Sequence, residues 1–430
     1  MNQVRIICKI NEDDSFKVDE KYIEYNINHN NRFTYTFWNK QLDLLPNFFT
    51  KTALDIFYIS LFVFGADRII SRNSTDDSWT RNIKLYIPVL DKKAWLENKS
   101  LLEEMLSFLS GDSWEIEFRR RELNEREIKF KDSIEDKNNI GIDFKKVCMF
   151  SGGLDSFIGA IELLDDTSEN DTLFVSHYGG GKGIKEYQDI LREELISKYQ
   201  LTESNFYSFY ASAKNGVEDT TRTRSFMFFS HAVVLASSVD RPVNLVIPEN
   251  GLISLNIPLT NSRLGSSSTR TTHPFYLSLF QKLLDNLKIM VKILNPYQFK
   301  TKGEMIRECS SIEFLQKNIT NTMSCSHPDW GRWAGESEVC HCGYCLPCVI
   351  RRSAIKNAGI QDETIYRDFD FTSLDVAKMN YSSYMLGVRK FDSKLAFLDI
   401  QKAGPLNQDL DRFTDLYIRG MSELIALLED

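Results

Sequence analysis

From Asp143 onward the sequence alternates short apolar segments with longer amphipathic ones, and this alternation constrains the fold more than any other feature. Short apolar runs are typical of buried strands, and amphipathic stretches of this length are typical of the helices that connect parallel strands. The predicted strands are Lys146 to Phe150, Thr172 to His177, Phe206 to Tyr210, Leu245 to Ile247 and Ile289 to Leu294. We therefore predict an α/β domain with a doubly wound, five-stranded parallel sheet that binds ligands at the carboxyl ends of its strands.

The regions on either side of this domain differ from it in their pattern of strand-like and helix-like segments. Residues 1 to about 140 mix strand-like and helix-like pieces, which predicts an N-terminal α+β domain. Its most apolar run, Leu54 to Phe64, is much shorter than the roughly 20 residues that cross a bilayer, so we interpret it as a core helix. The tail from Glu363 is mainly helical in pattern. The expected division is 1–140, 141–360 and 361–430.

Charge and cysteine usage exclude several classes of protein. The net charge of the 430 residues is -8, without a long run of like charges, so we expect no direct nucleic-acid partner. Neither a secretory signal at Met1 to Ile10 nor a membrane span is expected. Five of the eight cysteines lie between Cys325 and Cys348, which favours metal binding in a reducing cytoplasm over a disulfide framework.

A glycine-containing turn follows the first predicted strand of the α/β domain and precedes an amphipathic helix. Its residues are Ser151, Gly152, Gly153, Leu154, Asp155 and Ser156. Free amides and the positive end of a helix dipole favour a phosphate group here, and Asp155 can orient an amide or help hold the Mg²⁺ that accompanies ATP. A tight structural turn is the alternative, but the complete string between strand and helix favours an ATP phosphate site. No Lys follows at the Walker spacing.

A second candidate site is a cluster of cysteines near the end of this domain. Cys342, Cys345 and Cys348 are spaced three apart, and Cys325 lies upstream. Four thiolates can close a tetrahedral zinc shell, which leaves no open position for a substrate, so the predicted role of zinc is structural. For the fourth ligand, the alternatives to Cys325 are Cys340, His327 and His341.

The string SGGLDS resembles the PP-loop of N-type ATP pyrophosphatases, with the adenine nucleotide alpha hydrolase-like fold. Together with the cysteines, it is similar to the 7-cyano-7-deazaguanine synthase (QueC) family over roughly residues 145 to 355. The other matching motifs are Tyr178-Gly179, Arg222 and Arg224, Thr301-Lys302-Gly303-Glu304, Ser324-Cys325, and Cys342 through Arg352. The resemblance implies that ATP activates the carboxylate of 7-carboxy-7-deazaguanine, that pyrophosphate leaves, and that an amine then attacks.

The resemblance also suggests roles for individual residues. Ser151, Asp155, Ser156 and Lys302 are the expected catalytic residues, with Lys302 neutralising charge that grows on the phosphates; a solvated lysine at a helix start is the alternative. The predicted acid-binding residues lie in the polar stretch that follows the fourth strand: Glu249, Asn250, Arg263 and Arg270. Arginines can clamp a carboxylate with paired donors, but each of these four can also simply stabilise a loop.

Departures from the ordinary synthase point to a subgroup. The N-terminal extension and the segment from Glu249 to Pro274 look like the QatC subunit of the Qat anti-phage systems. The implied acceptor is an amine of a partner protein, encoded by the same defence operon, that the extra domain can dock. The alternatives are the ordinary nitrile synthase of queuosine biosynthesis and a nucleotide-binding scaffold that does not turn over.

Overall fold

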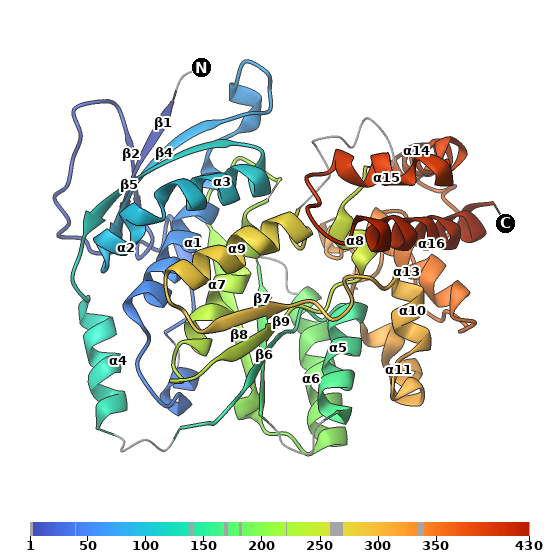
Figure 1. The fold of residues 1–430 in the computed structure, drawn as a ribbon, viewed down its shortest axis with the longest axis horizontal. Coiled ribbons are helices and arrows are strands. Elements are labelled where there is room, and N and C mark those ends of the chain that lie inside the picture. Colours follow the sequence, from blue (N-terminus) through green and yellow to red (C-terminus); the bar gives the residue numbers. More distant parts are fainter. Residues whose placement is uncertain are drawn as a thin grey trace.

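The computed structural model describes residues 3–38, 40–136, 141–166, 171–179, 183–220, 222–258, 270–333 and 339–429. These residues form two β-sheets with their helices and a C-terminal group of helices (Figure 1). Among the described residues, no helix combines the length and the apolar character that crossing a membrane requires.

The larger sheet has six strands in the order β10-β9-β6-β7-β8-β3. The strands are β3 (Phe33–Tyr35), β6 (Lys146–Met149), β7 (Thr172–Tyr178), β8 (Phe206–Ala213), β9 (Val243–Val246) and β10 (Val291–Leu294). The five predicted strands are all present and parallel. The predicted strand number was wrong, because β3 from the N-terminal region pairs antiparallel with the edge of β8.

Helices cover both faces of this sheet. They are α5 (Leu154–Asp165), α6 (Gly183–Tyr199), α7 (Arg224–Ala236) and α9 (Pro274–Asn286). The short helix α8 (Gly251–Leu255) instead packs against the last helix, α16 (Leu410–Leu428). Figure 1 shows α5 and α6 on one side of the strands and α7 and α9 on the other. Side chains of β6 alternate accordingly: Val147 and Met149 join the core under α7 and α9, whereas Cys148 and Phe150 join the core under α5 and α6. The sheet is therefore buried on both faces, as a doubly wound sheet requires.

The N-terminal region forms the smaller sheet, in the order β2-β1-β4-β5. Its elements are β1 (Val4–Lys9), β2 (Ile23–Asn26), β4 (Asn82–Val89), β5 (Ser113–Arg120), α1 (Lys51–Ile69), α2 (Lys92–Glu97), α3 (Lys99–Ser110) and α4 (Glu125–Glu135). All three pairings are parallel, so the predicted α+β character is corrected to a parallel sheet, with α1 before β4 and α2 and α3 between β4 and β5. Helices α2 and α3 meet at Asn98, whose side-chain amide donates to Ala94 O.

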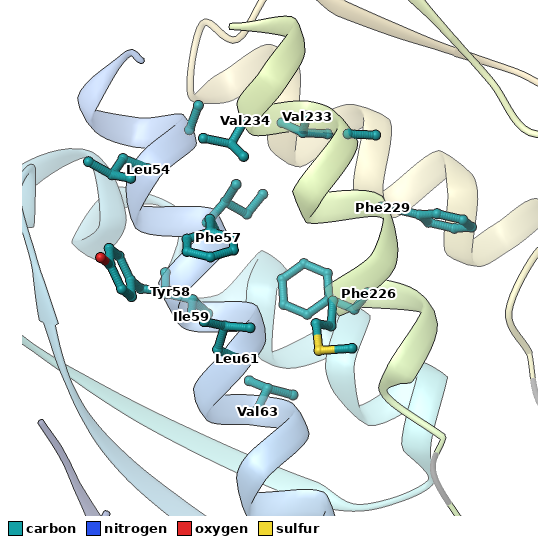
Figure 2. Packing of buried hydrophobic residues seen from close by; sticks show 14 of the residues in the cluster. Leu54, Phe57, Tyr58, Ile59, Leu61, Val63, Phe226, Phe229, Val233 and Val234 are labelled. Carbon is teal, nitrogen blue, oxygen red and sulfur yellow. The ribbon is translucent and has the colours of Figure 1, made fainter. Parts of the chain in front are cut away.

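Helix α1 joins the two regions. The predicted core helix from Leu54 to Phe64 lies within α1 and is buried on every side, and Figure 2 shows its apolar side chains packed against those of α7. At the end of α1, Asp67 accepts hydrogen bonds from Thr223 N and Thr223 Oγ1 at 3.0 and 2.9 Å. The first helical residue of α7, Arg224, is thereby positioned from the N-terminal region. The division at residue 140 stays a prediction.

The C-terminal part is helical, as its sequence pattern indicates. It contains α10 (Lys302–Arg307), α11 (Ile312–Asn318), α12 (Trp330–Trp333), α13 (Leu346–Asn357), α14 (Asp375–Lys390), α15 (Ala396–Asp399) and α16 (Leu410–Leu428). Glu423 of α16 accepts from Thr301 Oγ1 at 2.5 Å and from Gly303 N at 3.4 Å, on either side of Lys302. A Cβ at Gly303 would lie 2.4 Å from the Glu423 carboxylate. The last helix therefore supports the start of α10.

Candidate nucleotide site and metal centre

The glycine turn lies where the winding of the large sheet reverses. The strand order places β6 between β7 and β9, and the chain leaves β6 toward one side and reaches β9 on the other. The carboxyl ends at such a point open outward and form the usual ligand site of a doubly wound sheet. Residues Ser151 to Ser156 run directly from β6 into α5 at this edge.

The turn presents its backbone at the start of α5. Gly152 has a φ of 81°, in the left-handed region that favours glycine, and Gly153 is the N-cap of α5 without a side-chain cap. Ser151 is exposed and Ser156 is buried, and their hydroxyl groups lie 3.1 Å apart. Gly153 N donates to Ser151 Oγ at 3.3 Å, and a helix N-terminus next to two hydroxyls is suited to an anion such as a phosphate.

Neighbouring segments fix the turn from both sides. Gln188 of α6 donates to Ser151 O at 3.0 Å and to His177 O at 3.2 Å, and so ties the ends of β6 and β7 together. Met323 N donates to Gly152 O at 2.7 Å, and Leu154 N lies 3.4 Å from Ser324 Oγ. Our sequence reasoning did not identify Gln188, whose position on an ordinary helical pattern carries no signal.

Asp155, Lys302 and Asn250 meet beside the turn, although they are far apart in the sequence. Lys302 Nζ lies 2.9 Å from Asp155 Oδ1, and both side chains are almost fully buried. Asp155 Oδ2 accepts from Asn250 N at 3.1 Å and from Asn250 Nδ2 at 2.7 Å. Asp155 therefore orients a backbone amide, one of the two roles we considered, and the solvated alternative for Lys302 was wrong.

Glu249 adds a second carboxyl group to the same place. Burial and the neighbouring charge of Asp155 raise the pKa of Glu249 well above its usual 4.5. Burial also acts to raise the pKa of Asp155, but Lys302, Glu249 and Asn250 outweigh it and lower that pKa below 3.8. One lysine thus faces two carboxyl groups, and the arrangement favours an ionised Asp155 beside a protonated Glu249.

The unfolding free energy of Glu249→Gln is expected to fall less with rising pH than that of the wild type. The raised pKa means that Glu249 contributes stability that is complete below pH 4.5 and is lost as the pH rises through the folded-state pKa. Between pH 5 and 8 the wild type should therefore lose at least about 1 kcal/mol more unfolding free energy than Glu249→Gln. Urea denaturation at both pH values measures this difference. Equal losses in the two proteins would contradict it.

The four predicted cysteines come together in the structure. The sulfur atoms of Cys325, Cys342, Cys345 and Cys348 all lie within 4.8 Å of one another, and all four residues are buried. Two of the Sγ–Sγ distances are 3.9 Å, close to the ~3.8 Å that a tetrahedron with Zn–S bonds of ~2.3 Å requires. The donor set and its spacing fit a zinc ion that these four residues would hold.

The alternative fourth ligands lie outside this group. His341 Nδ1 is 3.7 Å from Cys348 Sγ, while Nε2 of the same ring contacts Thr322 O at 3.0 Å. His327 contributes its backbone amide to Cys325 Sγ at 3.3 Å. Cys340 is half-buried and is not one of the four clustered residues. The geometry therefore favours Cys325.

The cysteine cluster connects directly to the glycine turn. Cys325 follows Met323 and Ser324, the two residues that contact the turn. Arg351 of α13, which is fully buried, donates to Thr322 Oγ1 at 2.5 Å. A metal ion held by the cluster would therefore fix the segment that supports the candidate phosphate site, without lying among the reacting groups itself.

The arginines in this region have different positions. Arg270 donates to Phe108 O at 2.8 Å and lies against the Phe108 ring, so it faces the end of α3. Arg263 lies outside the described residues. Arg224 is the first residue of α7 and lies near His177 at the end of β7, where burial and the charge of Arg224 lower the pKa of the His177 ring. The sequence motif contained Arg224, but we had assigned it no role.

The fold and the site define an α/β protein with a candidate phosphate-binding turn and a candidate four-cysteine metal centre. Part of the chain is similar to 7-cyano-7-deazaguanine synthases of Brucella ovis, Brucella suis and Brucella melitensis, with 34% identity over 90 residues. These residues are 21% of this chain and span about a third, 34%, of the length of each relative. No protein-family model matches the chain.

Proposed function

We propose that the protein is an ATP-dependent synthase that adenylates a carboxylate, releases pyrophosphate and forms an amide. The observation that carries the proposal is the buried Lys302–Asp155 ion pair beside the open start of α5. A buried cation held beside the N-terminus of a helix is suited to stabilise a departing pyrophosphate. The partial similarity to 7-cyano-7-deazaguanine synthases supports the same chemistry.

In the proposed reaction, the phosphates of ATP contact the turn from Ser151 to Ser156. A carboxylate oxygen of the acid attacks the α phosphorus, the bond to the β phosphate breaks, and pyrophosphate leaves. An amine nitrogen then attacks the acyl carbon, loses a proton, and AMP leaves. Lys302 neutralises the charge that grows on the phosphates. Asp155 positions Lys302 and Asn250 beside the turn, and the Mg²⁺ that accompanies ATP would screen the phosphates when bound.

The proposed acid is 7-carboxy-7-deazaguanine. Glu249 lies beside Asp155 and can present its carboxyl group to a guanine-like edge. Asn250 is fully buried, and its side chain is used on Asp155 and as the N-cap of α8. Arg263 and Arg270 are proposed to bind anionic groups of the substrates.

The proposed acceptor is an amine on a partner protein, in the setting of anti-phage defence. The support is that the matched segment covers only 21% of the chain, and that the remainder includes an N-terminal sheet that a small-molecule reaction does not need. Free ammonia as the acceptor, with nitrile as the product, is the corresponding reaction of the ordinary synthase. A scaffold that binds ATP without turnover is the third outcome to be distinguished.

The test is pyrophosphate release from ATP with 7-carboxy-7-deazaguanine, measured with and without ammonia and with and without the protein encoded by the adjacent gene. Mass spectrometry of all products identifies the acceptor. We expect acid-dependent release and an increase in mass of the partner protein. Ammonia-dependent nitrile alone would replace the proposal by the ordinary synthase, and no release under any condition would leave the scaffold.

A further inference from the structure

The end of α3 gathers arginines that differ in how their charge is balanced. Arg72 forms two hydrogen bonds to the Asp112 carboxylate, each 2.9 Å long. Arg81 pairs with the same carboxylate at 2.7 Å and with Asp67 at 2.6 Å. All four side chains are buried. In this network two carboxylates balance two guanidinium groups, and the hydrogen bonds of these four side chains are made within the protein.

Arg222 and Arg270 lie next to this network without a carboxylate of their own. Arg222 donates to Ser110 O at 3.4 Å, and Arg270 donates to Phe108 O at 2.8 Å, so both reach the last turn of α3. In the part of the chain that the structure describes, neither guanidinium forms an ion pair with an Asp or Glu. Burial and Arg72 lower the pKa of Arg222 to about 10; Arg270 adds to this shift, and Asp112 and Asp67 oppose it. Burial also lowers the pKa of Arg270.

Two buried donors at this place have no acceptor among the described residues. Arg222 is only 6% exposed, and its Nη2 has no hydrogen-bond partner. His273 is fully buried, and its Nδ1 accepts from Phe275 N, so its proton lies on Nε2, which also has no partner. The His273 ring and the Arg270 guanidinium both contact the ring of Phe108.

Support of α3 explains only part of this arrangement. Cations near the carboxyl end of a helix are stabilising, and the stacking of Arg222 on Trp79 at 4.2 Å is favourable as well. Neither effect uses Arg222 Nη2 or His273 Nε2, and neither offsets the repulsion between neighbouring guanidinium groups. Burying positive charge and donors without acceptors is costly, and an anion bound there would supply the missing acceptors.

We infer that Arg222, Arg270 and His273 form a binding site for an oxyanion of the phosphate or carboxylate type. Guanidinium groups bind such anions through paired hydrogen bonds, and the neutral His273 contributes one more donor. Because Arg270 is also a proposed substrate-binding residue, the inference rests on the proposed function at that residue, but anion binding can be measured without ATP turnover. Arg222 reaches α3 through Ser110 O, whereas Arg224, two residues later, lies near His177 on β7.

Calorimetric titration with inorganic phosphate, and separately with acetate, tests this site. Wild-type protein is expected to bind one of these anions saturably. Binding of phosphate would indicate a phosphate ligand, and binding of acetate would indicate a carboxylate ligand. Arg222→Met and Arg270→Gln should each weaken that binding at least tenfold while the protein still unfolds cooperatively. Arg241→Met is the matched control, because it removes a guanidinium that pairs with Asp143 elsewhere, and it should bind as the wild type does.

Thermal unfolding in phosphate and in chloride of equal ionic strength gives a second readout. The extra stabilisation by the anion should be lost in Arg222→Met and kept in Arg241→Met. Binding that both Arg222→Met and Arg270→Gln leave unchanged would overturn the inference, and it would indicate that the glycine turn holds the anion. Absence of saturable binding of either anion would overturn it too, whereas a lack of pyrophosphate release from ATP would concern only the proposed function.

Discussion

Replacing Lys302 with Met is expected to reduce ATP-dependent pyrophosphate release by about 100-fold or more. Lys302 is the cation paired with Asp155 at 2.9 Å, and it is only 5% exposed. A charge held in a buried place is effective because no water has to reorganise when charge develops on the phosphates. Because this contact strengthens in the transition state, kcat should fall more than KM rises.

Lys300→Met is the matched control for this substitution. Lys300 lies two residues away and pairs with Glu308 near the surface, so its loss should change the rate less than twofold. Lys302→Met also leaves the Asp155 and Glu249 carboxyls without a cation, which can cost about 3–5 kcal/mol of stability. Rates are therefore compared at a temperature where urea unfolding shows both variants to be folded. Full activity of folded Lys302→Met would refute the proposed role.

Replacing Cys348 with Ser is expected to remove bound zinc and to lower the unfolding free energy by about 5 kcal/mol or more. Cys348 is fully buried, and its sulfur lies 3.9 Å from that of Cys342. Three remaining thiolates do not close a tetrahedral shell. Zinc content by atomic emission and urea unfolding measure the two effects. Because Met323 and Ser324 support the glycine turn from beside the cluster, pyrophosphate release should fall as well.

Cys340→Ser provides the control for the metal site. Cys340 is half-buried and lies outside the clustered sulfurs, although it is only two residues from Cys342. This variant should retain one zinc ion per chain and wild-type stability. Loss of zinc from Cys340→Ser with retention in Cys325→Ser would identify Cys340 as the fourth ligand and would overturn the assignment made from the geometry.

Features with local causes could be predicted from the sequence. The alternation of apolar and amphipathic segments indicated the strands from β6 to β10 and the helices between them. Strands that are buried on both faces of a parallel sheet are short apolar runs, and such runs are visible in the sequence. The turn from Ser151 to Ser156 was recognisable because its residues are contiguous. The cysteine spacing likewise indicated Cys342, Cys345 and Cys348, since ligands on one loop and the following helix need only short connections.

Features that depend on tertiary contacts could not be predicted. Strand β3 has three residues, which is too short for a periodic signal, and its identity as a strand comes from its pairing with β8. The pairing of Lys302 with Asp155 joins residues far apart in the chain, and nothing local distinguishes a buried lysine at a helix start from a solvated one. The parallel N-terminal sheet was missed because β1 and β2 are connected by a loop without a helix.

The way in which β3 and α1 cover the large sheet has a practical consequence. A fragment that begins after residue 140 would expose the free hydrogen-bonding groups along β8 and the apolar surface of α7, both of which promote self-association. Such a fragment should be recovered mainly in insoluble form, however complete its catalytic residues are. For expression, affinity tags and fusion partners are therefore best attached to the chain that includes residues 1–140, and not to the shorter fragment.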